Sequence, residues 1–182
     1  LRRAMPQQQV IGFIVFLVAM TLDIACGGCE IDPDATGHVV IPNTTETISI
    51  GMFKYCKNLR SVFIPSTVKE IGKNAFKGCT NLRTVSFPDS LETIGHKAFM
   101  SSGLREINLP ESLMSIGNDA FKRCPAECLS LCQTEGWNMR VTIPDSVTEI
   151  GDSVFEESGL TDLIIPSLTE IPPGICKQCY YL

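Results

Sequence analysis

Histidine and tryptophan are scarce in this sequence, which has two histidines and one tryptophan among 182 residues. His38 and His96 are far apart, and no pattern of acids or nucleophiles accompanies either, so neither is a credible catalytic base. A glycine-rich phosphate-binding loop is also absent. Basic residues are few: 15 Lys and Arg against 20 Asp and Glu give a net charge of -5, which excludes the usual electrostatic footprint of a nucleic-acid-binding protein. We therefore expect no catalytic residue, no metal ligand, no cofactor and no nucleic-acid partner.

Long hydrophobic runs are rare as well, and the run that stands out is Val10–Leu22. Two arginines precede it and the small residues of Ala25–Cys29 follow it, a pattern similar to a secretory signal peptide. A helix over this run would span about 20 Å, short of the roughly 30 Å hydrocarbon core of a membrane. We predict a signal peptide over residues 1–25, with an uncleaved signal anchor or a buried helix as alternatives, and a linker over residues 26–37.

A repeated pattern occupies the rest of the sequence. A short apolar run followed by a proline recurs at spacings of 23, 23, 22, 34 and 22 residues, at Pro42, Pro65, Pro88, Pro110, Pro144 and Pro166. A period near 23 with apolar residues at fixed offsets predicts a solenoid, in which each unit buries its apolar residues against its neighbours. We assign residues 38–182 to this solenoid, with about six units, and we interpret its end, partway through a unit, as a truncation.

Each unit is predicted to contain two short strands and one helical turn. Leu82–Pro88 alternates apolar and polar residues and then meets a proline, which cannot donate to a ladder, so we expect a short strand that ends there. Ser90–Gly95 gives a second extended run, closed by a glycine suited to a turn. Lys73–Cys79 has apolar residues at i, i+1 and i+4, which is typical of one helical turn.

Stacking of such units would align equivalent side chains in columns. We expect one column to form a buried aromatic spine, with members Phe53, Phe76, Phe99, Phe121 and Phe155. We expect a second column, two residues after each proline, to donate hydroxyl hydrogen bonds to turn backbone, with members Thr44, Thr67, Ser90, Ser112 and Ser146.

Ile64–Val85 follows the pattern IP-x-S-V-x-x-I-G-x-x-A-F-x-x-C-x-x-L-x-x-V, with threonine at the serine position, and the other units follow it imperfectly. This pattern resembles the BspA-like class of leucine-rich repeats. The resemblance covers about residues 38–182. It implies the α/β fold class, as a right-handed leucine-rich-repeat solenoid of short parallel strands and turns with single helical turns. It also implies a secreted or surface protein of a kind credited with adhesion or with binding proteins and extracellular matrix.

Nine cysteines are present. Cys56, Cys79 and Cys124 share one column, where a small apolar core residue is the simplest interpretation. Coils about 5 Å apart would also allow a disulfide between Cys56 and Cys79. Cys128 and Cys132 lie in an insertion and are able to pair with each other if that segment is not a regular helix, or either is able to bridge to Cys124.

Two further cysteine pairs, Cys26-x-x-Cys29 and Cys176-x-x-Cys179, have the spacing of zinc or redox sites. The first pair adjoins the predicted signal peptide, and the second falls in repeat columns. We therefore do not predict a zinc site from them.

The outward residues of the strands that precede the prolines form a candidate binding surface. Arg60, Arg83 and Arg105 should stack as a basic stripe on an otherwise acidic protein, although a solvated face without a partner is the alternative. The other candidates on these strands are Phe63, Ser86, Asn108 and Arg140.

A second candidate surface is the insertion at residues 125–138, which contains Trp137. Insertions in repeat arrays map to loops on one face and often bind. The alternative is a degenerate repeat in which Trp137 only covers the coil.

These patterns predict a non-catalytic protein-binding or adhesion module, secreted or displayed on a cell surface, with a protein or extracellular-matrix ligand as partner. Membrane contact is expected only through the N-terminal segment if it is not cleaved. The alternative is a structural or sensor ectodomain of a larger receptor-like protein whose effector part lies outside this sequence. Asn43 begins the sequence Asn-Thr-Thr, a candidate N-glycosylation site in a eukaryotic secretory pathway.

Overall fold

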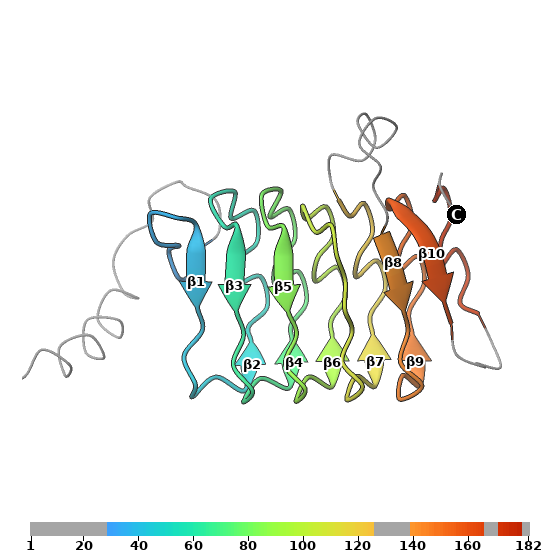
Figure 1. The fold of residues 1–182 in the computed structure, drawn as a ribbon, viewed down its shortest axis with the longest axis horizontal. Coiled ribbons are helices and arrows are strands. Elements are labelled where there is room, and N and C mark those ends of the chain that lie inside the picture. Colours follow the sequence, from blue (N-terminus) through green and yellow to red (C-terminus); the bar gives the residue numbers. More distant parts are fainter. Residues whose placement is uncertain (1–28, 126–138, 166–170, 180–182) are drawn as a thin grey trace, which may run out of the picture.

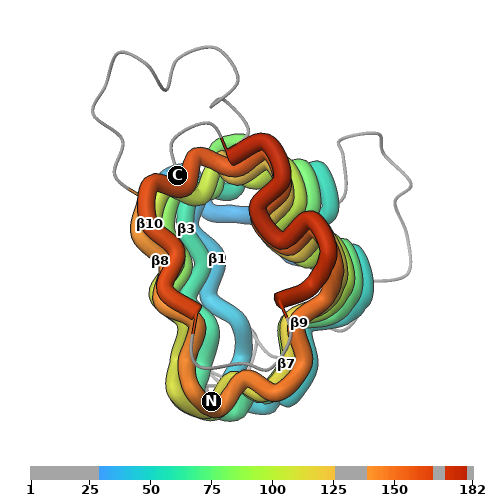
Figure 2. Tube along the Cα trace, turned by 90° about the vertical axis from the view of Figure 1, so that its right-hand side faces the viewer, coloured from blue at the N-terminus to red at the C-terminus, as the bar shows by residue number. Residues whose placement is uncertain are grey.

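Stacked coils of the chain form a parallel β-solenoid in the computed structural model, which describes residues 29–125, 139–165 and 171–179. Seen along the axis, each coil has three sides (Figure 2). Two sides carry short strands and the third carries a turn segment. The coils follow one another in sequence order along the axis (Figure 1). The predicted solenoid is therefore confirmed, and the repeat period is the length of one coil.

The strands of the described residues lie in two rows (Figure 1). One row contains sheet A, with β1 (His38–Val40), β3 (Ser61–Phe63) and β5 (Thr84–Ser86), and sheet C, with β8 (Met139–Thr142) and β10 (Leu160–Ile164). The other row is sheet B, with β2 (Thr47–Ile48), β4 (Glu70–Ile71), β6 (Thr93–Ile94), β7 (Ser115–Ile116) and β9 (Glu149–Ile150). The paired strands of the described residues are all parallel.

Register in sheet A follows the sequence columns. Val39 pairs with Val62, and Val62 with Val85, and all three side chains are buried in the core. Their neighbours Val40 and Phe63 point outward and are 60% and 51% exposed. The predicted alternation before each proline is confirmed, because one face of each strand packs inward while the other meets solvent.

The third side of the coil does not contain the predicted helical turn. In the first coil the Phe53 amide donates to the Ala75 carbonyl of the next coil (2.8 Å), whereas the Lys54 amide donates to Gly51 in its own coil (2.9 Å). Alternate N–H groups therefore point along the solenoid axis, where they join one coil to the next. An α-helix would use these groups within its own segment.

Two backbone positions on this side, four residues apart, adopt a left-handed conformation in every coil. The pairs are Gly51 and Tyr55, Asn74 and Gly78, Lys97 and Ser101, Asp119 and Arg123, Ser153 and Glu157, and Gly174 and Gln178. Left-handed residues at this spacing interrupt a right-handed helix. The helical-turn prediction was wrong because the stacking of coils, rather than local periodicity, determines this backbone.

The predicted aromatic spine is confirmed. Consecutive phenylalanine rings from Phe53 to Phe155 have centroids 5.1, 5.0, 5.3 and 5.6 Å apart, and their planes are within 8° of parallel. All five side chains are fully buried. In-register stacking of identical rings is the direct result of the repeat period.

Four of the five members of the hydroxyl column have their predicted role, whereas Thr44, in the first coil, makes no such bond among the described residues. Ser90 donates to the Val68 carbonyl, and Ser112 to the Leu91 carbonyl, each at 2.7 Å. Thr67 and Ser146 make equivalent bonds at 2.8 and 2.7 Å. In each case the acceptor is a turn carbonyl of the preceding coil, so the column ties neighbouring coils together.

The glycines that close the sheet B strands are required for close approach between coils. A Cβ atom added to Gly95 would lie 2.9 Å from backbone atoms of Ile71, Gly72 and Lys73, although Gly95 does not have a positive φ. Gly95 is therefore required by the close packing of two coils and not, as predicted, by a turn, since any side chain there would push the coils apart.

Part of the segment expected to be a linker packs on the first coil. A disulfide joins Cys29 to Cys56, and the Glu30 amide donates to the Met52 carbonyl at 2.9 Å. Residues 1–25, the predicted signal peptide or anchor, lie outside the described residues. Within the described ranges, no helix is long and apolar enough to cross a membrane.

Candidate binding surface

The three arginines of the predicted stripe occupy stacked backbone positions. The Arg83 amide donates to the Arg60 carbonyl (3.1 Å), and the Arg105 amide donates to the Arg83 carbonyl (3.2 Å). The Arg60 amide continues the ladder to Gly37 (2.7 Å). Arg60 and Arg105 are exposed, whereas Arg83 is partly buried and its Nη1 lies 3.4 Å from the Gly103 carbonyl oxygen. The coils therefore bring the three residues into one line, which we call the arginine row.

An exposed apolar pair lies on the outer face of sheet A, and Arg60 immediately precedes one of its strands, β3. Val40 and Phe63 are in register on β1 and β3, and the next member of their column is Ser86 on β5. Asn108 is exposed, and its Nδ2 donates to Glu106 at 2.7 Å. We define face A as the arginine row together with this column, comprising Arg60, Arg83, Arg105, Val40, Phe63, Ser86 and Asn108.

The sequence interpretation did not include Val40, although a signal for it was present. Val40 stands two residues before Pro42, as Phe63 stands two residues before Pro65. We treated its segment as a lead-in to the first unit, but β1 is a full member of sheet A. The offset from the proline was sufficient to place Val40 on the outer face.

Arg140 lies apart from the arginine row. It is on β8, where it is in register with Asp162 of β10, and its Nε donates to the Asp162 carboxylate at 2.7 Å. Both side chains are largely exposed, so this ion pair adds little to stability. The positive charge at this end of the row of strands is therefore balanced within the chain.

Of the two remaining candidates, Asn43 belongs to the described residues and Trp137 does not. Asn43 is exposed on the turn in which the Thr45 amide donates to the Pro42 carbonyl. Trp137 lies outside the described residues, as do Cys128 and Cys132. Binding by the insertion therefore stays a prediction.

The cysteines in the core column do not pair with one another. Cys56 is bridged to Cys29, so the Cys56–Cys79 disulfide considered from the sequence is not the one present. Cys79 and Cys124 are free, buried thiols, which also removes a bridge from Cys124 into the insertion. The Cys79 thiol donates to the Phe53 carbonyl and the Cys124 thiol to the Phe99 carbonyl, both at 2.9 Å. Adjacent coils place these sulfurs against backbone acceptors, which explains why small core residues suit the column.

Burial raises the pKa of the Cys79 thiol to about 12 and that of Cys124 to about 11. Thiols with such pKa values remain protonated near neutral pH and are poor nucleophiles. A further cysteine pair, Cys176 and Cys179, forms a disulfide in the last described coil.

Two ion pairs on the third side of the coils also shift pKa values. The hydrogen bond from Lys122 Nζ to Glu156 (2.8 Å) raises the pKa of the lysine and lowers that of the glutamate. Arg123 and Glu157 form a two-bond pair at 2.7 and 3.1 Å, and this pair lowers the pKa of Glu157. These pairs join the coils on either side of the insertion. They are consistent with a structural rather than a catalytic role.

Sheet B carries a shallow hollow of about 310 Å³, whose lining includes Thr93, Ser115 and Glu149 together with Ile94, Ile116 and Ile150. Among the described residues, no group of three or more His, Cys, Asp or Glu is arranged to hold a metal ion.

Comparisons with known proteins agree with this architecture. Among solved structures, a leucine-rich repeat protein from Bacteroides ovatus is 32% identical with a TM-score of 0.66, over 80% of this chain and 38% of that one. A T. pallidum leucine-rich repeat protein is 28% identical with a TM-score of 0.55, over 70% of this chain and 69% of that one. The pneumococcal vaccine antigen PcpA, at 23% identity and a TM-score of 0.53 over 75% of this chain and 42% of that one, shares the fold.

This chain thus spans well under half of the length of the Bacteroides ovatus protein. No curated protein matches the sequence. The family model described as BspA type leucine rich repeat region (6 copies) matches residues 35–136 and 137–182. The chain therefore belongs to the BspA type leucine-rich repeat family.

Proposed function

We propose that this chain is a non-catalytic protein-binding module, and that face A binds a segment of a partner protein that carries acidic and apolar side chains. The observation that carries the proposal is the arginine row beside an exposed apolar pair, on a chain whose net charge is -5. Guanidinium groups suit carboxylates, and Val40 and Phe63 offer apolar contact area within the same face.

Three stacked positive charges favour a partner of opposite charge. Like charges at neighbouring positions on paired strands repel, so three stacked arginines have an energetic cost. In the first coil the equivalent position is Gly37, whose carbonyl accepts the Arg60 amide. The column thus accepts a residue without charge, and an acidic partner would offset the repulsion.

Export to a cell surface or to the extracellular space is part of the proposal. The disulfides Cys29–Cys56 and Cys176–Cys179 are typical of proteins that fold in an oxidising compartment. The similarity to PcpA supports the fold and not the location. Surface display is tested by treating intact cells of the source organism with a protease and following loss of the chain, with a cytosolic protein as control.

A peptide library displayed on phage tests the binding surface. Peptides are selected on the wild-type protein, and their affinities are then measured for a variant in which Arg60, Arg83 and Arg105 are all replaced by serine. Three exposed ion pairs at about 0.2–1 kcal/mol each predict a loss of about tenfold in affinity, with little change in thermal stability. We expect the selected peptides to be enriched in Asp and Glu with apolar neighbours.

The matched control changes the same charge on other sides of the coils, by replacing Lys54, Lys69 and Lys73 with serine. Its affinity for the selected peptides should stay within about twofold of the wild type, because screened charges more than about 10 Å away contribute little. Equal loss in both variants would indicate attraction by net charge alone. Unchanged affinity in the arginine variant would show that the arginine row is only a solvated face.

A further inference from the structure

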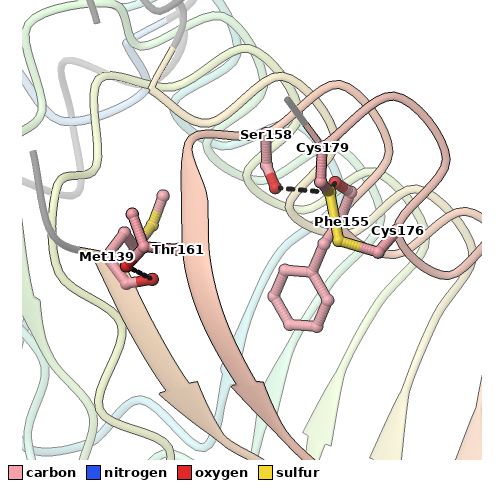
Figure 3. The surroundings of a disulfide bond; sticks show 6 residues. All are labelled: Met139, Phe155, Ser158, Thr161, Cys176 and Cys179. Carbon is pink, nitrogen blue, oxygen red and sulfur yellow. Dashed lines mark hydrogen bonds between the residues drawn. A yellow bond between two sulfur atoms is a disulfide. The ribbon is translucent and has the colours of Figure 1, made fainter. Parts of the chain in front are cut away.

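The Cys176–Cys179 disulfide is placed where the other coils have a phenylalanine and a thiol or hydroxyl. Cys176 follows Ile175, which accepts the Phe155 amide in the same way that Ala75, next to Phe76, accepts the Phe53 amide. Cys176 thus takes the aromatic column and Cys179 takes the column of Cys79 and Cys124. Figure 3 shows the disulfide beside the Phe155 ring, with the Ser158 hydroxyl next to Cys179.

The reduced form of this pair has hydrogen-bond partners already in place. Cys179 Sγ lies 3.1 Å from the Phe155 carbonyl oxygen, whereas the free thiols Cys79 and Cys124 donate to equivalent carbonyls at 2.9 Å. A sulfur in a disulfide has no proton to donate, so Cys179 donates to this carbonyl, which already accepts the Ser158 amide at 3.1 Å, only after reduction. The coil therefore accommodates either oxidation state without rebuilding its backbone.

Ser158 is positioned to assist a sulfur that leaves as a thiolate. Its hydroxyl is 3.5 Å from Cys179 Sγ, and the equivalent contact in an earlier coil joins Ser102 to Cys124 Sγ at 3.2 Å. At Cys124 this contact acts to lower the thiol pKa, against the larger effect of burial. A hydroxyl that donates to Cys179 makes it the better leaving group and leaves Cys176 as the sulfur to be attacked.

The other described disulfide is built differently. The Cys29–Cys56 bond closes a separation of 27 residues and joins a partly exposed cysteine to a fully buried one, whereas Cys176 and Cys179 are three residues apart and both partly exposed. Attack on a disulfide needs access to sulfur, and a short closed loop stabilises the oxidised form less than a long one. The two bridges should therefore differ in their response to a reductant.

We propose that Cys176 and Cys179 form a thiol–disulfide exchange site that reacts with dithiols while the coil stays folded. A thiolate of the dithiol attacks Cys176 Sγ, the bond to Cys179 breaks, and the electron pair leaves on Cys179 Sγ, which takes up a proton from solvent. The second thiol of the reductant then attacks the mixed disulfide. This releases Cys176 as a thiol and leaves the reductant as its own disulfide, so two electrons pass to the protein.

Reduction under native conditions tests this site independently of the proposed binding function. The folded protein is treated with dithiothreitol, quenched at intervals by alkylation, and analysed by mass spectrometry of the cysteine peptides. We expect Cys176 and Cys179 to be alkylated about tenfold faster than Cys29 and Cys56. The amides of Phe155 and Glu157, which donate to the Ile175 and Lys177 carbonyls of this coil, should remain protected from exchange in the reduced protein.

Replacement of Ser158 by alanine should slow reduction of the Cys176–Cys179 bridge about threefold. The matched control is Ser102→Ala, which removes the equivalent hydroxyl beside a free thiol and should leave this rate unchanged. Equal slowing in both variants would overturn the role of Ser158. Reduction of both bridges at one rate, reduction only in denaturant, or loss of amide protection at Phe155 and Glu157 would overturn the exchange site itself.

Discussion

Replacing Phe99 by alanine should be among the most destabilising single changes in the chain. Its ring lies between those of Phe76 (5.0 Å) and Phe121 (5.3 Å), and Phe87 meets it edge-on at 5.6 Å. Burial of the ring contributes about 1.5–3 kcal/mol, and each aromatic pair adds about 0.5–1.5 kcal/mol. With the cavity that remains, we expect a loss of about 3–5 kcal/mol in the free energy of unfolding.

Urea unfolding followed by circular dichroism measures this loss, and amide exchange shows which coils open, because repeat arrays do not always unfold in two states. Phe155→Ala is the graded variant, because among the described residues its ring packs against one other ring, that of Phe121 at 5.6 Å, and it should therefore cost less than Phe99→Ala. Phe63→Ala is the surface control, since this ring is 51% exposed, and should cost under about 1 kcal/mol. A Phe99→Ala effect no larger than that of Phe63→Ala would refute the spine as a source of stability.

Three further predictions concern the columns and the N-terminal segment. Ser90→Ala should lower the free energy of unfolding by about 1 kcal/mol in urea titrations, since it removes a 2.7 Å bond between coils; no measurable change would contradict the role of the hydroxyl column. Hydrogen bonds from Thr36 and backbone amides lower the pKa of Asp34 from 3.8 to about 2, so its contribution to stability is present above pH 3.8 and is lost as the pH falls through about 2. A carboxyl titration by NMR should show this midpoint, and Thr36→Val should raise it; a midpoint near 3.8 in the wild type would refute the turn. Cys79 and Cys124 should react with maleimide only after unfolding, because both thiols are buried and have raised pKa values; rapid native labelling, detected by mass spectrometry, would contradict their place in the core.

The sequence was sufficient to predict the columns because the chain repeats at the length of one coil. Once consecutive coils stack in register, equivalent residues must lie above one another. Phe76 therefore meets Phe99, and Ser90 meets a carbonyl of the previous coil. The stacking of Arg60 on Arg83 follows from the same register. These contacts need no information beyond the period and the inward or outward direction of each residue.

Features that depend on contacts between coils were not predictable from a single unit. The turn side was interpreted as helical because local apolar spacing resembled one helical turn, whereas Asn74 and Gly78 are both left-handed there. Cys56 was compared with Cys79 because both belong to the repeat, but its partner is Cys29, which precedes the first unit. The repeat pattern relates only positions that recur from unit to unit, so it could not identify Cys29 as the partner of Cys56.

Binding and stability depend on different columns in this solenoid. Inward residues such as Val62 pack on neighbouring coils, and the adjacent Phe63 points into solvent and contributes little to that packing. Changes to the arginine row should therefore alter affinity at constant stability, whereas Phe99→Ala should alter stability while the protein that remains folded still binds. If affinity and stability instead change together in both sets of variants, face A takes part in holding the coils together. The cost of stacked arginines would then need a structural explanation within the chain rather than a partner.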